Sequence, residues 1–225
     1  MPEVRFDGRP VLVFGASGAL GAGVAAALAE AGASVTGVDR AKPPAGRALD
    51  GVAYREADAG DEDAVRALFD SMPAPWAVLN TVGGFAGQRA LADLDLAELA
   101  GQVSLNLVTA AVITKHALRV MRPAGRGRIV HTASRAGVVT KGYGFAYSVS
   151  KAGVLHLVSM AADEARGSGI TVNCVVPSFI DTPANRAAIP DADYAAWPKV
   201  PDIAQTFVYL ASPGSGLVNG AAIPV

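Results

Sequence analysis

The stretch Pro10-Val-Leu-Val-Phe14-Gly15-Ala-Ser-Gly18-Ala-Leu-Gly21 decides the fold class. Its first five residues are apolar, which is typical of a short strand that is buried on both faces of a sheet. Three glycines follow at intervals of three residues, and residues 19–31 are helix formers that stop at Gly32. A strand, a glycine turn and a helix in direct succession predict the start of a parallel α/β sheet.

The rest of the chain repeats this alternation of strand and helix. Further strands are predicted over Ser34–Val38, Val52–Arg55, Trp76–Asn80, Arg128–Thr132, Thr171–Val176 and Ala221–Val225. Further helices are predicted over Asp61–Met72, Leu94–Met121, Ala146–Arg166 and Ile203–Ala211. Because no long linker divides the chain, we expect one α/β domain over residues 1–225, with a doubly wound parallel sheet of about seven strands and helices on both faces.

Composition narrows the class of protein. The chain has 19 Lys and Arg against 20 Asp and Glu, so it has no basic excess for a nucleic-acid partner. Hydrophobic residues make up 51% of the chain, but the longest apolar runs, Val11–Phe14 and Ala22–Ala29, are shorter than the roughly 20 residues of a membrane span. The three histidines are dispersed, which argues against a metal site. With no apolar signal core at the N-terminus, a cytoplasmic protein is expected.

The glycine turn predicts a nucleotide-binding end. Glycines let the backbone approach a pyrophosphate, and the start of the following helix offers free N–H groups. The candidate contacts with the cofactor in this turn are Gly15, Ser17, Gly18, Ala19, Leu20 and Gly21.

Two acidic residues extend this end of the predicted site. Asp39 ends the second strand, where a carboxylate would bind the adenosine ribose and repel a 2′-phosphate, so NAD is favoured over NADP. Arg40 opposes that preference, because a guanidinium is able to bind the same phosphate. Asp58, just after the third strand, is a candidate for binding the adenine amino group.

A phenol and an ammonium define a second, catalytic end. Tyr147 and Lys151 are one helical turn apart, so they share a helix face. A phenol with a pKa near 10 is a poor acid or base at neutral pH, and a nearby cation is expected to lower that pKa. Ser134 follows the fifth strand, where its hydroxyl would orient a substrate oxygen. Asn106 lies within a predicted helix, where we expect a local kink and a water that passes protons to Lys151.

With these residues, the sequence resembles the short-chain dehydrogenase/reductase family, in its short single-domain branch, from about residue 8 to 223. The resemblance rests on the glycine turn, Asp58, Asn80-Thr-Val-Gly83, Asn106, Ser134, Tyr147, Lys151 and the segment Pro177–Thr182. It implies a Rossmann fold and an Asn106–Ser134–Tyr147–Lys151 tetrad in which Tyr147 is the acid–base. It also implies cofactor contacts at Asn80, Val82, Gly83, Tyr147, Lys151, Pro177, Ile180 and Thr182, and a homo-oligomer (tetramer or dimer) built on paired long helices.

Several departures leave a second enzyme open. Phe14 stands where the family usually has threonine, the first two glycines are one residue closer than usual, and Ser178 replaces a glycine. The glycine turn, residues 82–87 and residues 181–197 resemble dihydropteridine reductases, a branch of the family that lacks the serine found here at Ser134.

The sequence therefore predicts an NAD(P)-dependent oxidoreductase that transfers a hydride between a nicotinamide cofactor and a small carbonyl or alcohol substrate. The alternatives are a dihydropteridine reductase-like enzyme and a non-catalytic NAD(P)-sensing protein on the same fold. Residues 181–201 are expected to form a short substrate lid. Candidate substrate contacts are Phe85, Phe145, Tyr194 and Trp197, while the identity of the substrate and the direction of the reaction stay open.

Overall fold

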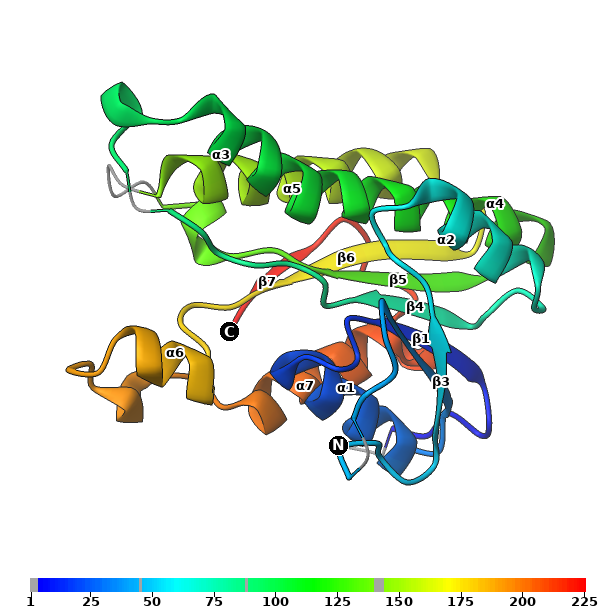
Figure 1. The fold of residues 1–225 in the computed structure, drawn as a ribbon. Helices are drawn as coiled ribbons and strands as arrows, with labels where there is room; N and C mark the ends of the chain where they lie inside the picture. Colours follow the sequence, from blue (N-terminus) through cyan, green and yellow to red (C-terminus); the bar gives the residue numbers. More distant parts are fainter. Residues whose placement is uncertain (1–3, 45, 88, 140–143) are drawn as a thin grey trace.

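A seven-stranded parallel sheet forms the centre of the computed structural model, which describes residues 4–44, 46–87, 89–139 and 144–225 (Figure 1). The strand order is β3-β2-β1-β4-β5-β6-β7. The strands are β1 (Pro10–Phe14), β2 (Ser34–Asp39), β3 (Val52–Glu56), β4 (Ala77–Asn80), β5 (Gly127–Thr132), β6 (Ile170–Val176) and β7 (Ala222–Pro224). This order confirms the predicted doubly wound Rossmann sheet.

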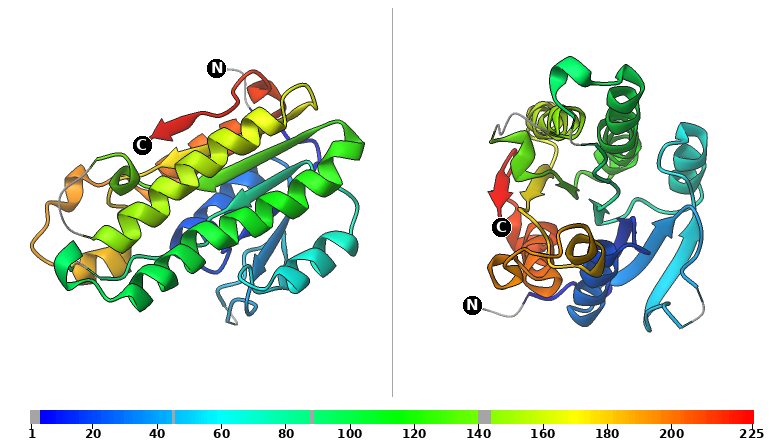
Figure 2. Two further views of the ribbon diagram at one scale, coloured as in Figure 1. Left: turned by 90° about the horizontal axis from the view of Figure 1, so that it is seen from above. Right: turned by 60° about the vertical axis from the view of Figure 1, so that its left-hand side comes forward.

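Helices cover both faces of the sheet (Figures 1 and 2). On one face lie α1 (Ala19–Glu30) and α7 (Val200–Ala211), which also pack against each other. On the other face lie α2 (Glu62–Asp70), α4 (Thr109–Ala124) and α5 (Phe145–Glu164). Two shorter helices, α3 (Leu96–Gln102) and α6 (Pro183–Ala188), lie toward the carboxyl ends of the strands.

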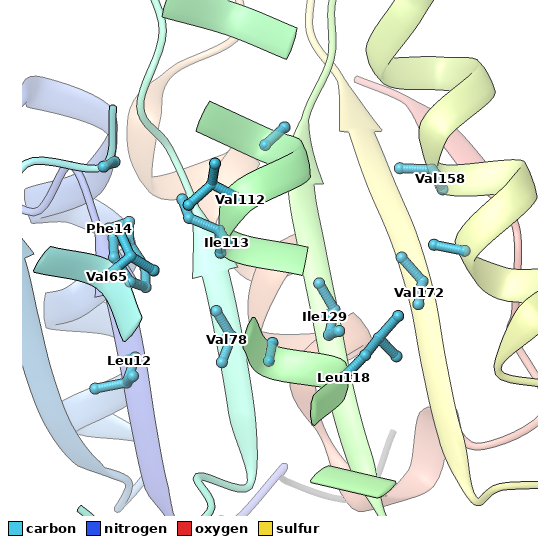
Figure 3. Packing of buried hydrophobic residues seen from close by; sticks show 14 of the residues in the cluster. Leu12, Phe14, Val65, Val78, Val112, Ile113, Leu118, Ile129, Val158 and Val172 are labelled. Carbon is cyan, nitrogen blue, oxygen red and sulfur yellow. The ribbon is translucent and has the colours of Figure 1, made fainter. Parts of the chain in front are cut away.

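The first strand shows why every residue in its run is apolar. Leu12 and Phe14 pack into the core under α2, α4 and α5 (Figure 3), whereas Val11 and Val13 pack into the core under α1 and α7. Successive side chains of a strand point to opposite faces, so a sheet covered on both faces needs an apolar residue at each position.

Helix α2 shows how local signals set an element in place. Asp61 caps its first turn, because the carboxylate accepts hydrogen bonds from the backbone N–H groups of Asp63 and Ala64. Val65 and Phe69 are then buried one helical turn apart, next to β1.

The long helix predicted over Leu94–Met121 is present but interrupted. A π-helical turn, Val103–Val108, separates α3 from α4 and contains Asn106, which confirms the expected local irregularity. Together these elements form a helical stretch over Leu96–Ala124 that is long and apolar enough, by length and composition, to cross a membrane. In the fold, Ala110, Ile113 and Met121 of this stretch are fully buried against the sheet, as in a core helix.

The remaining predicted elements agree with the structure within a few residues at their ends. Helix α6 and four single helical turns were not predicted; the turns are Leu91–Asp93, Arg135–Gly137, Tyr194–Ala196 and Pro213–Ser215. Elements of three to six residues are too short to show a hydrophobic period, which explains why the pattern missed them.

Candidate active site

The candidate site begins where strand order reverses, between β1 and β4. Gly15 follows β1 with φ +80°, and a Cβ atom on it would lie 2.8 Å from Thr81 Oγ1 and 2.9 Å from Val82 N. A Cβ atom on Gly21 would likewise collide with the carbonyl oxygen of Gly15. Only glycine satisfies both the backbone angle and the close approach at residue 15.

The start of α1 points toward this turn with open donors. Gly18 caps the helix with no side-chain hydrogen bond, so Ala19, Leu20 and Gly21 present first-turn N–H groups without a capping side chain. Ser17 lies in the same turn, exposed, with its hydroxyl 3.5 Å from the carbonyl oxygen of Ala41. This arrangement suits a pyrophosphate, which is the group that the sequence predicted here.

Asp39 lies beside the glycine turn at the end of β2. Its Oδ2 accepts a hydrogen bond from Ser17 N at 3.1 Å, and its Oδ1 accepts one from Arg40 N at 2.8 Å. The backbone thus fixes the carboxylate and leaves further lone pairs for a hydroxyl donor. The side chain of Arg40 is exposed.

Asp58 caps a local turn after β3. Its Oδ1 accepts a hydrogen bond from Gly60 N at 2.8 Å, and the residue is exposed. The second carboxylate oxygen is therefore the group available for an adenine amino group.

The turn after β4 is fixed by Asn80, which is buried. Its Oδ1 accepts a hydrogen bond from Val82 N at 3.0 Å. A Cβ atom on Gly83 would lie 2.7 Å from Asn106 Oδ1 and 3.0 Å from Lys151 Nζ. The cofactor loop predicted at Asn80, Val82 and Gly83 therefore lies directly against two of the predicted catalytic side chains.

The predicted catalytic residues come together at the carboxyl ends of the strands. The hydroxyl of Ser134 lies close enough to the phenol of Tyr147 to act on its pKa. Lys151 Nζ lies 5.9 Å from the centre of the Tyr147 ring and donates to the carbonyl oxygen of Thr132 at 2.9 Å. Ser134 and Lys151 are buried, at 8% and 3% exposed, and Tyr147 is half-buried.

Burial dominates the electrostatics of this pair. It raises the pKa of Tyr147, and the nearby Ser134 hydroxyl opposes that rise. Burial also lowers the pKa of Lys151 to about 8. The lowering of the phenol pKa that the sequence predicted from a nearby ammonium is not found in the protein alone, because burial raises this pKa and Ser134 is the group that opposes the rise.

Asn106 is held by residues that sequence reasoning missed. Its Oδ1 accepts from Gly84 N at 3.1 Å, while its Nδ2 lies 3.1 Å from both Gly84 O and Ser150 Oγ and 3.3 Å from Gln102 Oε1. Ser150 in turn donates to the carbonyl oxygen of Tyr147 at 2.7 Å. The signal that could have found Ser150 is its place immediately before Lys151, one turn after Tyr147, on the buried side of the helix.

The segment after β6 closes the other side of the site. Pro177 O accepts from Arg135 N at 3.0 Å, which ties this segment to the turn after Ser134. Thr182 caps α6 by accepting from Asn185 N at 3.2 Å, and Asn185 Nδ2 donates to Ile180 O at 2.8 Å. Asn185 is a second residue that sequence reasoning missed, and its hydrogen bonds hold two predicted cofactor contacts, Ile180 and Thr182.

The segment predicted as a lid is folded, and residues near its two ends pair with each other. Asp181 pairs with Lys199 as an isolated β-bridge and forms a bidentate ion pair with Arg186, at 2.6 and 2.8 Å. The guanidinium of Arg186 is exposed and lies 4.7 Å from the centre of the Tyr194 ring.

The four predicted substrate residues lie in different settings. The Phe85 ring meets the Tyr147 ring edge-on at 5.2 Å and is 53% exposed. Trp197 stacks on Phe179 at 5.5 Å and meets Tyr194 edge-on at 5.0 Å. The Tyr194 hydroxyl lies within hydrogen-bonding distance of three carbonyl oxygens of residues 186–190, so it supports the fold of this segment. Phe145 begins α5 and is half-buried.

Comparison with known proteins identifies the family. Residues 15–225 match the family model described as Enoyl-(Acyl carrier protein) reductase. The chain is 35% identical over 240 residues to cis-4-hydroxycyclohexanecarboxylate dehydrogenase of Sinomonas cyclohexanicum, covering 98% of this chain and 96% of that protein. The chain belongs to the short-chain dehydrogenase/reductase family. It is therefore an oxidoreductase of a family that acts on alcohol or carbonyl substrates with a nicotinamide cofactor.

Other short-chain dehydrogenases and reductases agree with this assignment. Galactitol 2-dehydrogenase of Rhizobium johnstonii is 32% identical, with 99% of this chain and 95% of that protein covered. The solved structure of a short-chain type dehydrogenase/reductase from Mycobacterium ulcerans superposes with a TM-score of 0.90 at 29% identity, covering 99% of this chain and 90% of that one.

Proposed function

We propose that this short-chain dehydrogenase/reductase interconverts a secondary alcohol and a ketone on a small carbon skeleton, with Tyr147 as the general acid–base. The observation that carries the proposal is the convergence of Ser134, Tyr147 and the buried Lys151 at the carboxyl ends of the strands. The nearby glycine turn and the open start of α1 fit the pyrophosphate of a dinucleotide.

Each residue of the tetrad has a distinct task. A nicotinamide cofactor, when bound, supplies or accepts the hydride. Tyr147 gives its phenolic proton to the substrate oxygen during reduction and takes a proton back during oxidation. Ser134 orients the same oxygen and favours the phenolate form of Tyr147, because it lowers the pKa of the phenol. Lys151 holds a positive charge 5.9 Å from the centre of the phenol ring. Asn106 fixes the backbone of the loop after β4 by accepting a hydrogen bond from Gly84 N.

We favour NAD as the cofactor, with NADP as the alternative. The two backbone N–H groups that hold Asp39 orient its carboxylate at the end of β2, where the adenosine ribose binds in this fold. A ribose hydroxyl donates to such a carboxylate, whereas a 2′-phosphate is repelled by it. Asp58 is the candidate contact for the adenine amino group.

The proposed substrate class rests on the chemistry of the tetrad and on the names of similar proteins. The names of the relatives point to a hydroxylated cyclohexane acid and to sugar alcohols, all of which carry secondary hydroxyl groups. Similar proteins are named as dehydrogenases and reductases, which favours an enzyme over a non-catalytic nucleotide sensor.

The test is a substrate panel assayed with NAD and NADP at several pH values. It contains cis-4-hydroxycyclohexanecarboxylate, galactitol, D-threitol and quinonoid dihydropterin, each assayed with wild type and with Ser134→Ala. Turnover of a secondary alcohol that Ser134→Ala reduces supports the proposal. Turnover of the dihydropterin alone, with Ser134→Ala fully active, would instead favour the dihydropteridine reductase-like alternative.

We also propose that the chain forms a homo-oligomer through the outer face of α4 and α5, which run side by side (Figure 2). Met160 on α5 is 60% exposed, and Val108, next to the start of α4, is 42% exposed. An ion pair between Arg122 and Glu164 bridges the two helices at one end of this face. Exposed apolar side chains on paired helices are typical of an interface between identical subunits.

A further inference from the structure

A buried imidazole lies beneath the candidate cofactor loop, and the chemistry described above does not use it. His131 on β5 is 0% exposed and is hydrogen-bonded at both ring nitrogens. Its Nδ1 lies 3.2 Å from Asn80 Nδ2, and its Nε2 lies 2.8 Å from Thr114 Oγ1. Asn80 and Thr114 are themselves buried, at 3% exposed each. The ring therefore joins the end of β4 to helix α4 inside the protein.

The partners determine where the proton of the ring lies. Thr114 Oγ1 donates its single hydrogen to the carbonyl oxygen of Ala110 at 2.7 Å, so toward His131 it acts as an acceptor. Nε2 must then carry a hydrogen. The amide nitrogen of Asn80 is able only to donate, so Nδ1 must be unprotonated. Together these contacts require the neutral Nε2–H tautomer.

The same network fixes which way the Asn80 amide faces. Val82 N donates to Asn80 Oδ1 at 3.0 Å, so the amide nitrogen must point away from Val82, toward His131. An Nδ1–H or a charged imidazole would place two N–H groups against each other at that contact. The state of the imidazole and the position of the Val82 N–H are thereby linked through one side-chain amide.

The surroundings of His131 favour the same neutral form. Burial, together with the nearby Lys151 ammonium, lowers the pKa of His131 to about 4. Cys174 of the neighbouring β6 is the register partner of His131 and is fully buried, with a pKa raised to about 12 by burial. Lys151 is thus the cation near the ring, and both the imidazole and the thiol beside it are neutral at pH 7.

We propose that His131 is a positioning residue for the cofactor loop: as a neutral Nε2–H imidazole, held by Thr114, it orients Asn80 so that the backbone at Val82 and Gly83 is fixed. The inference rests on the proposed function, because Val82 and Gly83 are proposed to bind the cofactor. It concerns affinity for the cofactor and leaves the roles of Tyr147 and Ser134 unchanged.

The first test replaces the partner of His131 and leaves the ring in place. Thr114→Val keeps the shape of the side chain and removes the acceptor of the Nε2–H group. Loss of one neutral hydrogen bond is worth about 0.5–1.5 kcal/mol, so the Kd for NADH, measured by fluorescence titration, is expected to rise about 2- to 10-fold. The value of kcat at saturating cofactor is expected to change less.

Thr109→Val is the matched control. Thr109 is also buried on α4 and donates to a carbonyl oxygen four residues back, that of Leu105 at 2.5 Å, but it has no hydrogen bond to His131 among the described contacts. Its substitution is expected to leave the Kd for NADH unchanged. An unchanged Kd in Thr114→Val, or an equal rise in both variants, would overturn the positioning role.

A second measurement uses the wild-type protein alone. The imidazole ¹⁵N shifts of His131 in the wild-type protein at pH 7 are expected to be those of a neutral ring that is protonated at Nε2. A ring that is charged or protonated at Nδ1 would overturn the inference.

If the wild type binds neither NADH nor NADPH, the proposed function fails as well. If NADH binds tightly and Thr114→Val has no effect, only the role of His131 fails.

Discussion

The side-chain amide of Asn106 lies 3.1 Å from the hydroxyl of Ser150, across a sequence separation of 44 residues. This contact joins the π-helical turn to α5, the helix that carries Tyr147 and Lys151. Ser150 also donates to the backbone carbonyl of Tyr147, so one buried hydroxyl links two members of the proposed tetrad.

Ser150→Ala is therefore expected to reduce kcat about 2- to 10-fold, because the carboxamide of Asn106 loses one of its neutral hydrogen-bond partners. The Kd for NADH is expected to stay close to that of the wild type. Steady-state kinetics and a fluorescence titration measure the two quantities. Ser159→Ala, an exposed position on the same helix, serves as the control and is expected to match the wild type. Equal kcat values in all three proteins would contradict this role of Ser150.

Asp39 is expected to set the preference between the two cofactors. Asp39→Asn keeps the size of the side chain and removes the charge that would oppose a 2′-phosphate. About 1.4 kcal/mol of lost repulsion corresponds to a roughly tenfold fall in the ratio of kcat/KM for NAD to that for NADP. Asp50→Asn, an exposed acid in the loop after β2, is the control for the change in net charge. A ratio that stays at the wild-type value would show that Asp39 does not select the cofactor.

The stability of the fold is expected to depend on pH through His131. Its pKa falls from the ordinary 6.5 to about 4 on folding, because burial disfavours the charged ring. Below pH 6.5 the unfolded chain binds this proton more readily than the folded one, so stability decreases as the pH falls from about 6.5 toward 4. The full shift in the pKa of His131 corresponds to a change of up to about 3 kcal/mol in the free energy of unfolding.

Urea unfolding of wild type and of His131→Gln across pH 4–7 measures this dependence. The variant lacks the titrating ring, so its free energy of unfolding should vary less with pH than that of the wild type. Asn80, Thr114, Cys174 and Lys151 surround the ring, and Lys151, with a pKa of about 8, keeps its charge over this range. Parallel pH profiles of the two proteins would refute the assignment.

The outer face of α4 and α5 is expected to join subunits. Met160→Glu places a charge at an exposed apolar position of this face and should lower the mass measured by light scattering to that of a smaller assembly. Leu91→Glu, at a position that is 62% exposed outside this face, is the control and should leave the mass unchanged. A wild-type protein that is monomeric in dilute solution would argue against the interface.

Much of the fold follows from local sequence patterns. The strand Pro10–Phe14, the glycine turn and Asp39 have short-range signals, and all of them lie where the pattern indicated. Position 15 requires glycine for two reasons, its φ of +80° and the close approach of Thr81. Thr81 follows a different strand, so only the three-dimensional fold brings it near.

The support of the site depends on contacts between distant residues, so the sequence did not reveal it. Ser150, for example, reaches Asn106 from a separate helix, 44 residues further along the chain. The raised pKa of Tyr147 was also missed, because helical spacing indicates that a cation is near but says nothing of how much water the fold removes.

The central claim is that Tyr147 transfers the proton in the reaction. Tyr147→Phe removes only the phenolic hydroxyl, and Tyr209→Phe, at a 46% exposed position on α7, is the matched control. The direct measurement is kcat on a substrate found in the panel, together with the Kd for NADH. The account predicts that Tyr147→Phe lowers kcat about 10²- to 10⁴-fold with the Kd nearly unchanged, while Tyr209→Phe matches the wild type. A kcat for Tyr147→Phe equal to that of the wild type would contradict it.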